Sequence, residues 1–183
     1  MKKTFLNFAN VALVTLMLMS TYACKEDPYA KITYKVVCSE ELLKFATPKV
    51  NYKGTTISIP ESGWTNVTNE STKINDVNVP LKQWTYNVDY NDFGVVDDEM
   101  TVEYEPKNNF AEAPLSIANL LIHHLSADVE IRDKDENLYR HSFNNTELNI
   151  SIGNPASLDD RLEPDYIGLH IESNGTCIKK TTK

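Results

Sequence analysis

Apolar and polar side chains alternate along most of this chain after residue 30. Successive side chains of a β-strand point to opposite faces, so alternation of this kind predicts strands with one buried face. The pattern is longest in residues 81–90 and 121–132. Their inward positions are Trp84, Tyr86, Val88 and Tyr90 in the first segment, and Leu121, His123, Leu125, Ala127, Val129 and Ile131 in the second.

Shorter alternating segments fill most of the remaining chain. Residues 138–143 are expected to form a partner strand. The inward positions of the other segments are Ile32, Tyr34, Val36 and Cys38; Val50 and Tyr52; Ile57 and Ile59; Met100, Val102 and Tyr104; Leu148, Ile150 and Ile152; and Ile167, Leu169 and Ile171. Lys53-Gly54 and Asn174-Gly175 predict hairpin turns, the second of type I′. Ser39 is expected to cap one short helical turn over residues 40–45, and the polar segment 60–78 to form a loop.

Eight or more short strands joined by turns, each with one buried face, predict an all-β fold. We expect an antiparallel β-sandwich of the immunoglobulin-like kind, with a closed barrel as the alternative.

The first 24 residues have the three parts of an export signal. Lys2 and Lys3 precede an apolar run from Val11 to Met19, which is too short to span a bilayer, and Ala23 stands directly before Cys24. This order predicts a cleaved lipoprotein signal peptide over 1–23, a lipid-modified Cys24, a tether over 24–30 and a single domain over 31–183. The alternative is an ordinary signal peptidase site after Ala23, which would release a protein without lipid.

Charge narrows the class of partner. The formal net charge is −8, and removing residues 1–23, which carry two Lys and no acid, leaves 160 residues with −10. So acidic a body argues against nucleic acid as a partner and against attraction to anionic lipid. The expected partners are the membrane, reached through the lipid anchor, and a protein or glycan of unknown identity.

Three segments resemble small envelope lipoproteins of the Bacteroidota, a group with no known activity. They are residues 34–45, 84–92 and 99–107. In addition, the basic and acidic residues of Lys25-Glu26-Asp27 resemble the signal that sends such lipoproteins to the outer face of the outer membrane. The resemblance implies an outer-membrane location, surface-exposed in preference to periplasmic, and it transfers no functional residue.

With Cys24 lipidated, Cys38 and Cys177 are the remaining cysteines. An oxidising envelope would permit a disulfide between them. A two-residue turn at 174–175 would pair Ile171 with Ile178 and turn Cys177 away from the core, whereas Cys38 faces inward. This register argues against the bond.

No residue pattern in the sequence predicts a metal or a cofactor. Asp133, Asp135 and Asn137 alternate like calcium ligands, but Leu138 and Asn144 replace the Gly and Glu of a calcium loop, and turn chemistry explains the cluster. A second acidic group is read as a solvated loop; it contains Asp92, Asp97, Asp98 and Glu99. The histidines, such as His123, are read as packing residues. No catalytic motif is present, so no catalytic residue is predicted.

Aromatic side chains provide the remaining candidate site. The tryptophan and tyrosines of residues 84–90 are needed for a core face, whereas Trp64 stands in a predicted loop and is the better candidate for stacking on a sugar. Our first hypothesis is a non-catalytic binding module for a protein or glycan. The alternatives are a glycan- or peptide-acting hydrolase that uses paired carboxylates, and a structural subunit of a surface assembly such as a fimbria.

Overall fold

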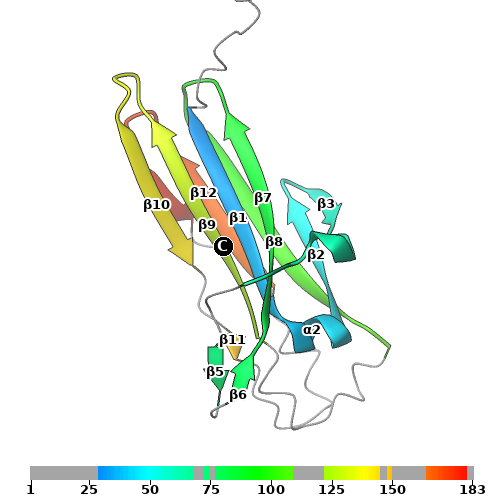
Figure 1. The fold of residues 1–183 in the computed structure, drawn as a ribbon. Coiled ribbons are helices and arrows are strands. Elements are labelled where there is room, and N and C mark those ends of the chain that lie inside the picture. The colour runs from blue at the N-terminus through cyan, green and yellow to red at the C-terminus, as the bar shows by residue number, and fades with distance from the viewer. Residues whose placement is uncertain are drawn as a thin grey trace, which may run out of the picture.

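The computed structural model describes residues 29–67, 72–74, 77–108, 122–144, 148–149 and 164–180. Within these residues the chain is built almost entirely of strands, with one short helix and one 3-10 turn (Figure 1). The elements are β1 (Ala30–Ser39), α2 (Glu40–Phe45), β2 (Ala46–Tyr52), β3 (Thr55–Ser58), η1 (Glu61–Gly63), β4 (Thr65–Asn66), β5 (Thr72–Ile74), β6 (Val77–Val79), β7 (Leu81–Tyr90), β8 (Val96–Pro106), β9 (Ile122–Arg132), β10 (Leu138–Asn144), β11 (Leu148–Asn149), β12 (Asp165–Ile171) and β13 (Cys177–Lys180).

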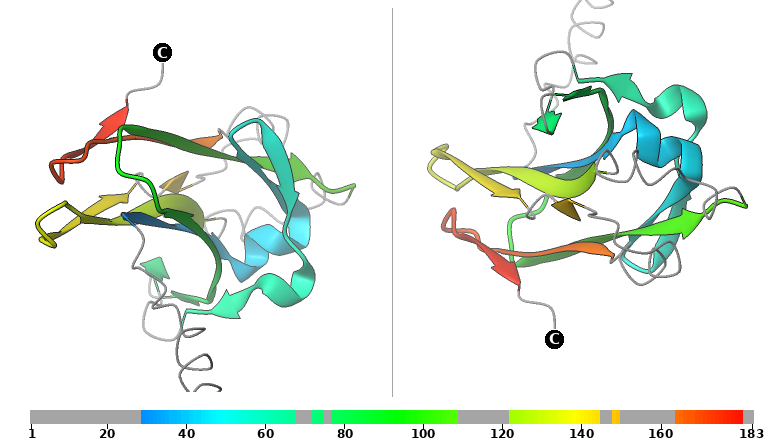
Figure 2. Two further views of the ribbon diagram at one scale, coloured as in Figure 1. Left: turned by 90° about the horizontal axis from the view of Figure 1, so that it is seen from above. Right: turned by 90° about the horizontal axis from the view of Figure 1, so that it is seen from below.

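Two antiparallel sheets form the two layers seen end-on in Figure 2. One has the order β10-β9-β1-β7-β4, with β11 also paired to β9, and the other has the order β13-β12-β8-β2-β3. The predicted antiparallel β-sandwich is therefore confirmed. Along the chain, β1 pairs with β7 and β2 pairs with β8, as strands B and E, and C and F, do in an immunoglobulin domain. The other edge of β1 pairs with β9, a strand that comes much later in the chain.

The core lies between the sheets and follows the alternation of the sequence. In β9 the inward side chains from Leu125 to Ile131 are at most 1% exposed, and in β12 Ile167, Leu169 and Ile171 are fully buried. Each such side chain removed from water contributes about 1.5–3 kcal/mol. Burial of these two stripes against each other therefore holds the layers together.

The segment after η1 contains more structure than the predicted loop over 60–78. Two residues of β4 pair with β7, and β5 pairs with β6 in a small separate sheet. These strands are two or three residues long, too short for an alternating pattern to show.

The two hairpin predictions have different outcomes. Lys53 and Gly54 both have positive φ, 47° and 78°, as the type I′ turn between β2 and β3 requires. At the second hairpin Gly175 alone has positive φ, 87°, and its N–H donates to the carbonyl of Glu172 at 3.1 Å. This is a three-residue loop with a left-handed last residue, not the predicted type I′ turn.

The longer loop shifts the register of β13 by one residue. Ile171 pairs with Cys177, which is 8% exposed and belongs to the core cluster, while Ile178 is 54% exposed. The prediction that Cys177 faces away from the core is therefore wrong. The thiols of Cys38 and Cys177 are nevertheless unbonded. Cys38 contacts Tyr104 near the end of β8, whereas Cys177 lies level with Val96 at its start, and eight residues of strand span roughly 25 Å.

Candidate functional site

A groove of about 440 Å³ opens where α2, the start of β2 and the chain around η1 meet. We call it the Trp64 groove. It is lined by Glu40, Leu43, Lys44, Ala46, Thr47, Pro48, Ile59, Glu61, Trp64, Lys82 and Lys107. Its volume is in the range of small-ligand sites, and hydrogen-bonding side chains surround a half-buried tryptophan.

Backbone contacts on both sides position Trp64. The turn η1 brings the chain in, and a side chain at Gly63 would lie 3.3 Å from the ring of buried Trp84, so the chain passes closely over the core. Thr65 then pairs with Gln83 of β7, and its hydroxyl donates to the Gln83 carbonyl at 3.1 Å. Trp64 is thus held at the groove by a fixed backbone and not by a free loop.

The helix α2 provides the opposite wall. As predicted, the Ser39 hydroxyl caps it by accepting from the Leu42 amide at 3.2 Å. Lys107, just after β8, donates its backbone N–H to the Phe45 carbonyl at 2.7 Å and its ammonium to the Leu43 carbonyl at 2.6 Å. Free carbonyls at a helix end attract such donors, and this fixes the Lys107 ammonium beside the groove.

The charged groups of the groove are accessible and only partly paired. Lys82 donates to the Asn66 amide oxygen at 2.6 Å and lies 3.8 Å from Glu40. Lys44 pairs with Glu41 at 2.6 Å, and this hydrogen bond raises the pKa of the lysine. Within the described part of the chain, no carboxylate pairs with Lys107. The groove therefore offers ammonium donors and carboxylate acceptors around one aromatic face.

A second hollow, of about 570 Å³, lies at the other end of the sandwich around the β7–β8 connection. Asp92 and Asp97 line it, but Asp97 turns to the outer face of β8 and pairs with Lys180 at 2.7 Å and His170 at 2.8 Å. Those hydrogen bonds, that of Lys180 foremost, lower the pKa of Asp97. The predicted acidic loop is wrong for residues 97–99, which are part of β8 and point alternately outward and inward.

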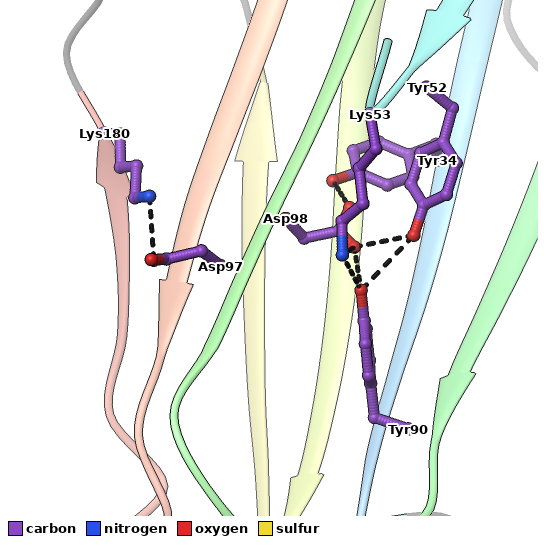
Figure 3. A network of polar contacts seen from close by, with 7 residues as sticks. All are labelled: Tyr34, Tyr52, Lys53, Tyr90, Asp97, Asp98 and Lys180. Atoms are coloured by element: carbon purple, nitrogen blue, oxygen red, sulfur yellow. Dashed lines mark hydrogen bonds and ion pairs between the residues drawn. The ribbon is translucent and has the colours of Figure 1, made fainter. Parts of the chain in front are cut away.

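Asp98 is 1% exposed and is the centre of a polar cluster between the sheets (Figure 3). Its carboxylate accepts from the hydroxyls of Tyr34 at 2.5 Å and Tyr52 at 2.8 Å, and from Tyr90 through a short hydrogen bond. The Lys53 ammonium lies 3.1 Å from the same carboxylate. A buried carboxylate is tolerated only when it is paired and hydrogen-bonded, and here four donors from both sheets meet that need.

The environment of these tyrosines keeps them protonated. Burial, reinforced by the neighbouring carboxylate, raises the pKa of Tyr90 to about 12 and raises those of Tyr34 and Tyr52 still further above the ordinary value. Such hydroxyls are poor proton acceptors at neutral pH. These tyrosines therefore act as hydrogen-bond donors that join the two sheets.

A second buried cluster lies near the groove end of the core. Asp165, 3% exposed, accepts from the Tyr104 hydroxyl at 2.9 Å and from His123 Nδ1 at 2.8 Å. The remaining ring nitrogen of His123, Nε2, is buried and has no hydrogen-bond partner within the described residues. Burial raises the pKa of the adjacent Cys38 thiol well above its usual value. A thiol held protonated is a weak nucleophile, so this arrangement is structural.

The alternating acids of the β9–β10 turn are occupied by turn hydrogen bonds. The Asp133 carboxylate accepts from the backbone amides of Asp135 and Asn137, both at 2.9 Å, and from the Tyr139 hydroxyl at 3.1 Å. These bonds, the one from the Asn137 side chain foremost, lower the pKa of Asp133. Among the residues that the structure describes, no group of three or more metal-ligating side chains converges.

The structure thus brings one predicted site residue, Trp64, into a groove, and places Cys38 and Cys177 in the core. Cys24 and the expected signal peptide lie outside the described residues. Neither the groove nor the two buried carboxylates was predicted from the sequence. Alternation did contain a signal for the latter, because Asp98 and Asp165 occupy inward positions of their strands, in phase with Met100 and Ile167.

No helix within the described ranges is long and apolar enough to cross a bilayer. A scan of protein-family models, a search of curated proteins and a search of solved structures each found no match to this chain.

Proposed function

We propose that this chain is an envelope lipoprotein whose β-sandwich is a non-catalytic binding module, with the Trp64 groove as a glycan-binding site. The observation that supports the proposal is the Trp64 side chain, carried by a fixed backbone, beside lysine and glutamate side chains in one groove. An aromatic face can pack against the apolar C–H face of a sugar ring, while donors and acceptors around it bind hydroxyls. The location follows from the expected lipidation of Cys24 and from the resemblance to Bacteroidota lipoproteins.

The arrangement of acids argues for binding over hydrolysis. A glycosidase of the usual kind needs two carboxyl groups at a set separation, one of them protonated at neutral pH by an apolar setting. Glu40 and Glu61 share the groove, but both are exposed to solvent. The buried carboxylates, Asp98 and Asp165, are enclosed in the core and lie outside the groove lining.

Screening the full chain in detergent against a glycan array, followed by calorimetry with the best ligand, tests the site. Loss of the indole stacking in Trp64→Ala should weaken binding about tenfold or more, equivalent to about 1.4 kcal/mol. Phe93→Ala is the matched control, because Phe93 is an exposed aromatic residue at the other end of the sandwich. Equal affinity of Trp64→Ala and wild type would exclude the groove as the site.

The same ligands separate binding from turnover. We expect the glycan to be recovered unchanged after prolonged incubation, as measured by mass spectrometry. Cleavage that disappears in Glu40→Gln or Glu61→Gln would instead support the hydrolase alternative.

One feature favours a structural subunit as a second candidate. In the described part of the chain, β4 and the following Val67 pair with β7 only from Leu81 to Gln83, so the backbone from Trp84 to Tyr90 has an open edge on that side. Open edges accept an added strand from a partner chain. Light scattering after size-exclusion chromatography would detect such an assembly, and a monomer at all concentrations would count against this candidate.

A further inference from the structure

The point where the chain enters the sandwich is at one end of the molecule. Tyr29 is 1% exposed, its hydroxyl donates to the Gly94 carbonyl at 2.8 Å, and its carbonyl accepts from the Arg132 amide at 2.8 Å. Its ring also packs on Phe93 at 4.9 Å between centroids. The body is therefore fixed from Tyr29 onward. We call this end, with the β7–β8 and β9–β10 connections, the tether end.

Only five residue steps separate Tyr29 from Cys24. A fully extended chain advances at most about 3.6 Å per residue, so Tyr29 lies within about 18 Å of the Cys24 backbone in any conformation. If Cys24 carries lipid at the membrane surface, the tether end must stay close to that surface.

The Trp64 groove lies at the opposite end. Strand β1 begins at the tether end, where Ala30 pairs with Tyr90 and Ile131, and runs to Ser39, which caps α2 at the groove (Figure 1). Ten residues of strand cover about 30 Å. The length of the sandwich therefore separates the groove from the anchor.

The exposed charges of the tether end determine whether it inserts into the membrane. Its connections expose the apolar side chains of Phe93 and Val95, the carboxylates of Asp92, Asp135 and Glu136, and the ammonium of Lys134. Transferring these two apolar side chains from water would contribute at most about 6 kcal/mol, whereas removing the charged groups from water costs more. The tether end should therefore stand on the surface without inserting into it.

From these features we infer that the lipid anchor and its short tether hold the sandwich upright, with the tether end towards the membrane and the Trp64 groove facing away from it. The inference rests on the lipid anchor of the proposed function. In this orientation the groove binds a glycan presented from beyond the membrane, free or on another surface, and lies about one sandwich length from the headgroups of the leaflet that holds Cys24.

Energy transfer to a headgroup-labelled lipid tests the orientation with the full lipidated chain in phosphatidylethanolamine-rich vesicles. One fluorophore is placed on Phe93→Cys at the tether end and another on Ser62→Cys, an exposed position in η1 at the groove end. The native thiols of Cys38 and Cys177 are buried, and labelling of the wild type checks that they do not react. We expect strong transfer from position 93 and at least several-fold weaker transfer from position 62.

A variant with 20 Gly/Ser residues inserted after Asp27 is the control for the tether. Its tether spans roughly 25–30 Å on average and is flexible, so the contrast between the two labels should largely disappear. Equal transfer from both positions without the insertion, or stronger transfer from position 62, would overturn the inference.

Failure of this inference and failure of the glycan site are distinguishable. Mass spectrometry shows whether Cys24 carries lipid, and an unlipidated chain would overturn the orientation while leaving ligand binding in detergent unaffected. Conversely, a chain that stands upright and binds no glycan would refute the groove assignment alone.

Discussion

At the scale of the residue, Asp97 and Asp98 show how neighbouring identical side chains acquire different roles. Alternation along β8 points Asp97 outward to Lys180 and Asp98 inward to three tyrosines (Figure 3). Water screens the exposed Asp97–Lys180 pair, and exposed ion pairs contribute about 0–1 kcal/mol to the free energy of unfolding. Around the buried carboxylate no water can replace a lost donor, so each of its hydrogen bonds contributes more to the stability of the fold.

Asp98→Asn should therefore lower the free energy of unfolding by about 3 kcal/mol, because the amide cannot accept from four donors. Tyr34→Phe should cost about 2 kcal/mol through the loss of one hydrogen bond to a charged group. Asp97→Asn is the control on the same strand and should cost less than about 1 kcal/mol. Urea denaturation measures all three, and equal effects at 97 and 98 would contradict the assignment of Asp98 to the core.

The same cluster predicts loss of stability in alkali. The folded state raises the pKa of Tyr90 to about 12, whereas an unfolded tyrosine titrates near 10. A raised pKa contributes stability that is complete below pH 10 and is lost as the pH rises through 12. Tyrosinate absorbance near 295 nm should show a group of the nine tyrosines that ionises only as the protein unfolds. Ionisation of all tyrosines with the ordinary pKa of about 10 while the fold stays intact would contradict this prediction.

At the scale of the element, the two hairpins differ in what surrounds their glycine. Both Gly54 and Gly175 have positive φ, but nothing lies within 4 Å of a side chain built at Gly54. At Gly175 the same atom would lie 2.4 Å from the ring of Tyr139. The β12–β13 turn is thus closed against β10, which the dipeptide Asn174-Gly175 does not reveal.

Gly54→Ala should cost about 1–2 kcal/mol, the price of a left-handed alanine, and Gly175→Ala should cost more because the ring must also move. In the double variant Gly175→Ala/Tyr139→Ala the steric part should vanish, so the two single effects should not add. Thermal unfolding of the set measures the coupling. Strict additivity would show that Tyr139 does not restrict the turn.

At the scale of the whole molecule, the two core thiols mark opposite ends of one sandwich. Cys38 lies at the groove end and Cys177 at the tether end, and burial raises the pKa of Cys177 to about 11. A thiol that is both buried and protonated reacts slowly.

Iodoacetamide at pH 8 should therefore leave both thiols unmodified in the native protein and modify both in urea, as counted by mass spectrometry without reductant. A mass two daltons lower, with no labelling in urea, would reveal a Cys38–Cys177 disulfide and contradict the placement of the two thiols at opposite ends of the sandwich.

Hydrophobic alternation by itself determined the fold class, most strands and the inward faces, because burial of one face needs only local periodicity. The residue types alone also predicted the Ser39 cap and the Lys53-Gly54 turn, because capping and turn formation depend on neighbouring residues in the sequence. The tertiary structure alone decided the rest. Register at β13 depended on a turn that packs against Tyr139, and the Trp64 groove joins α2, η1 and Lys107, which are distant in the chain. Asp98 and Asp165 could be placed inward from the pattern, but their donors come from the opposite sheet, and only packing of the two layers brings them together.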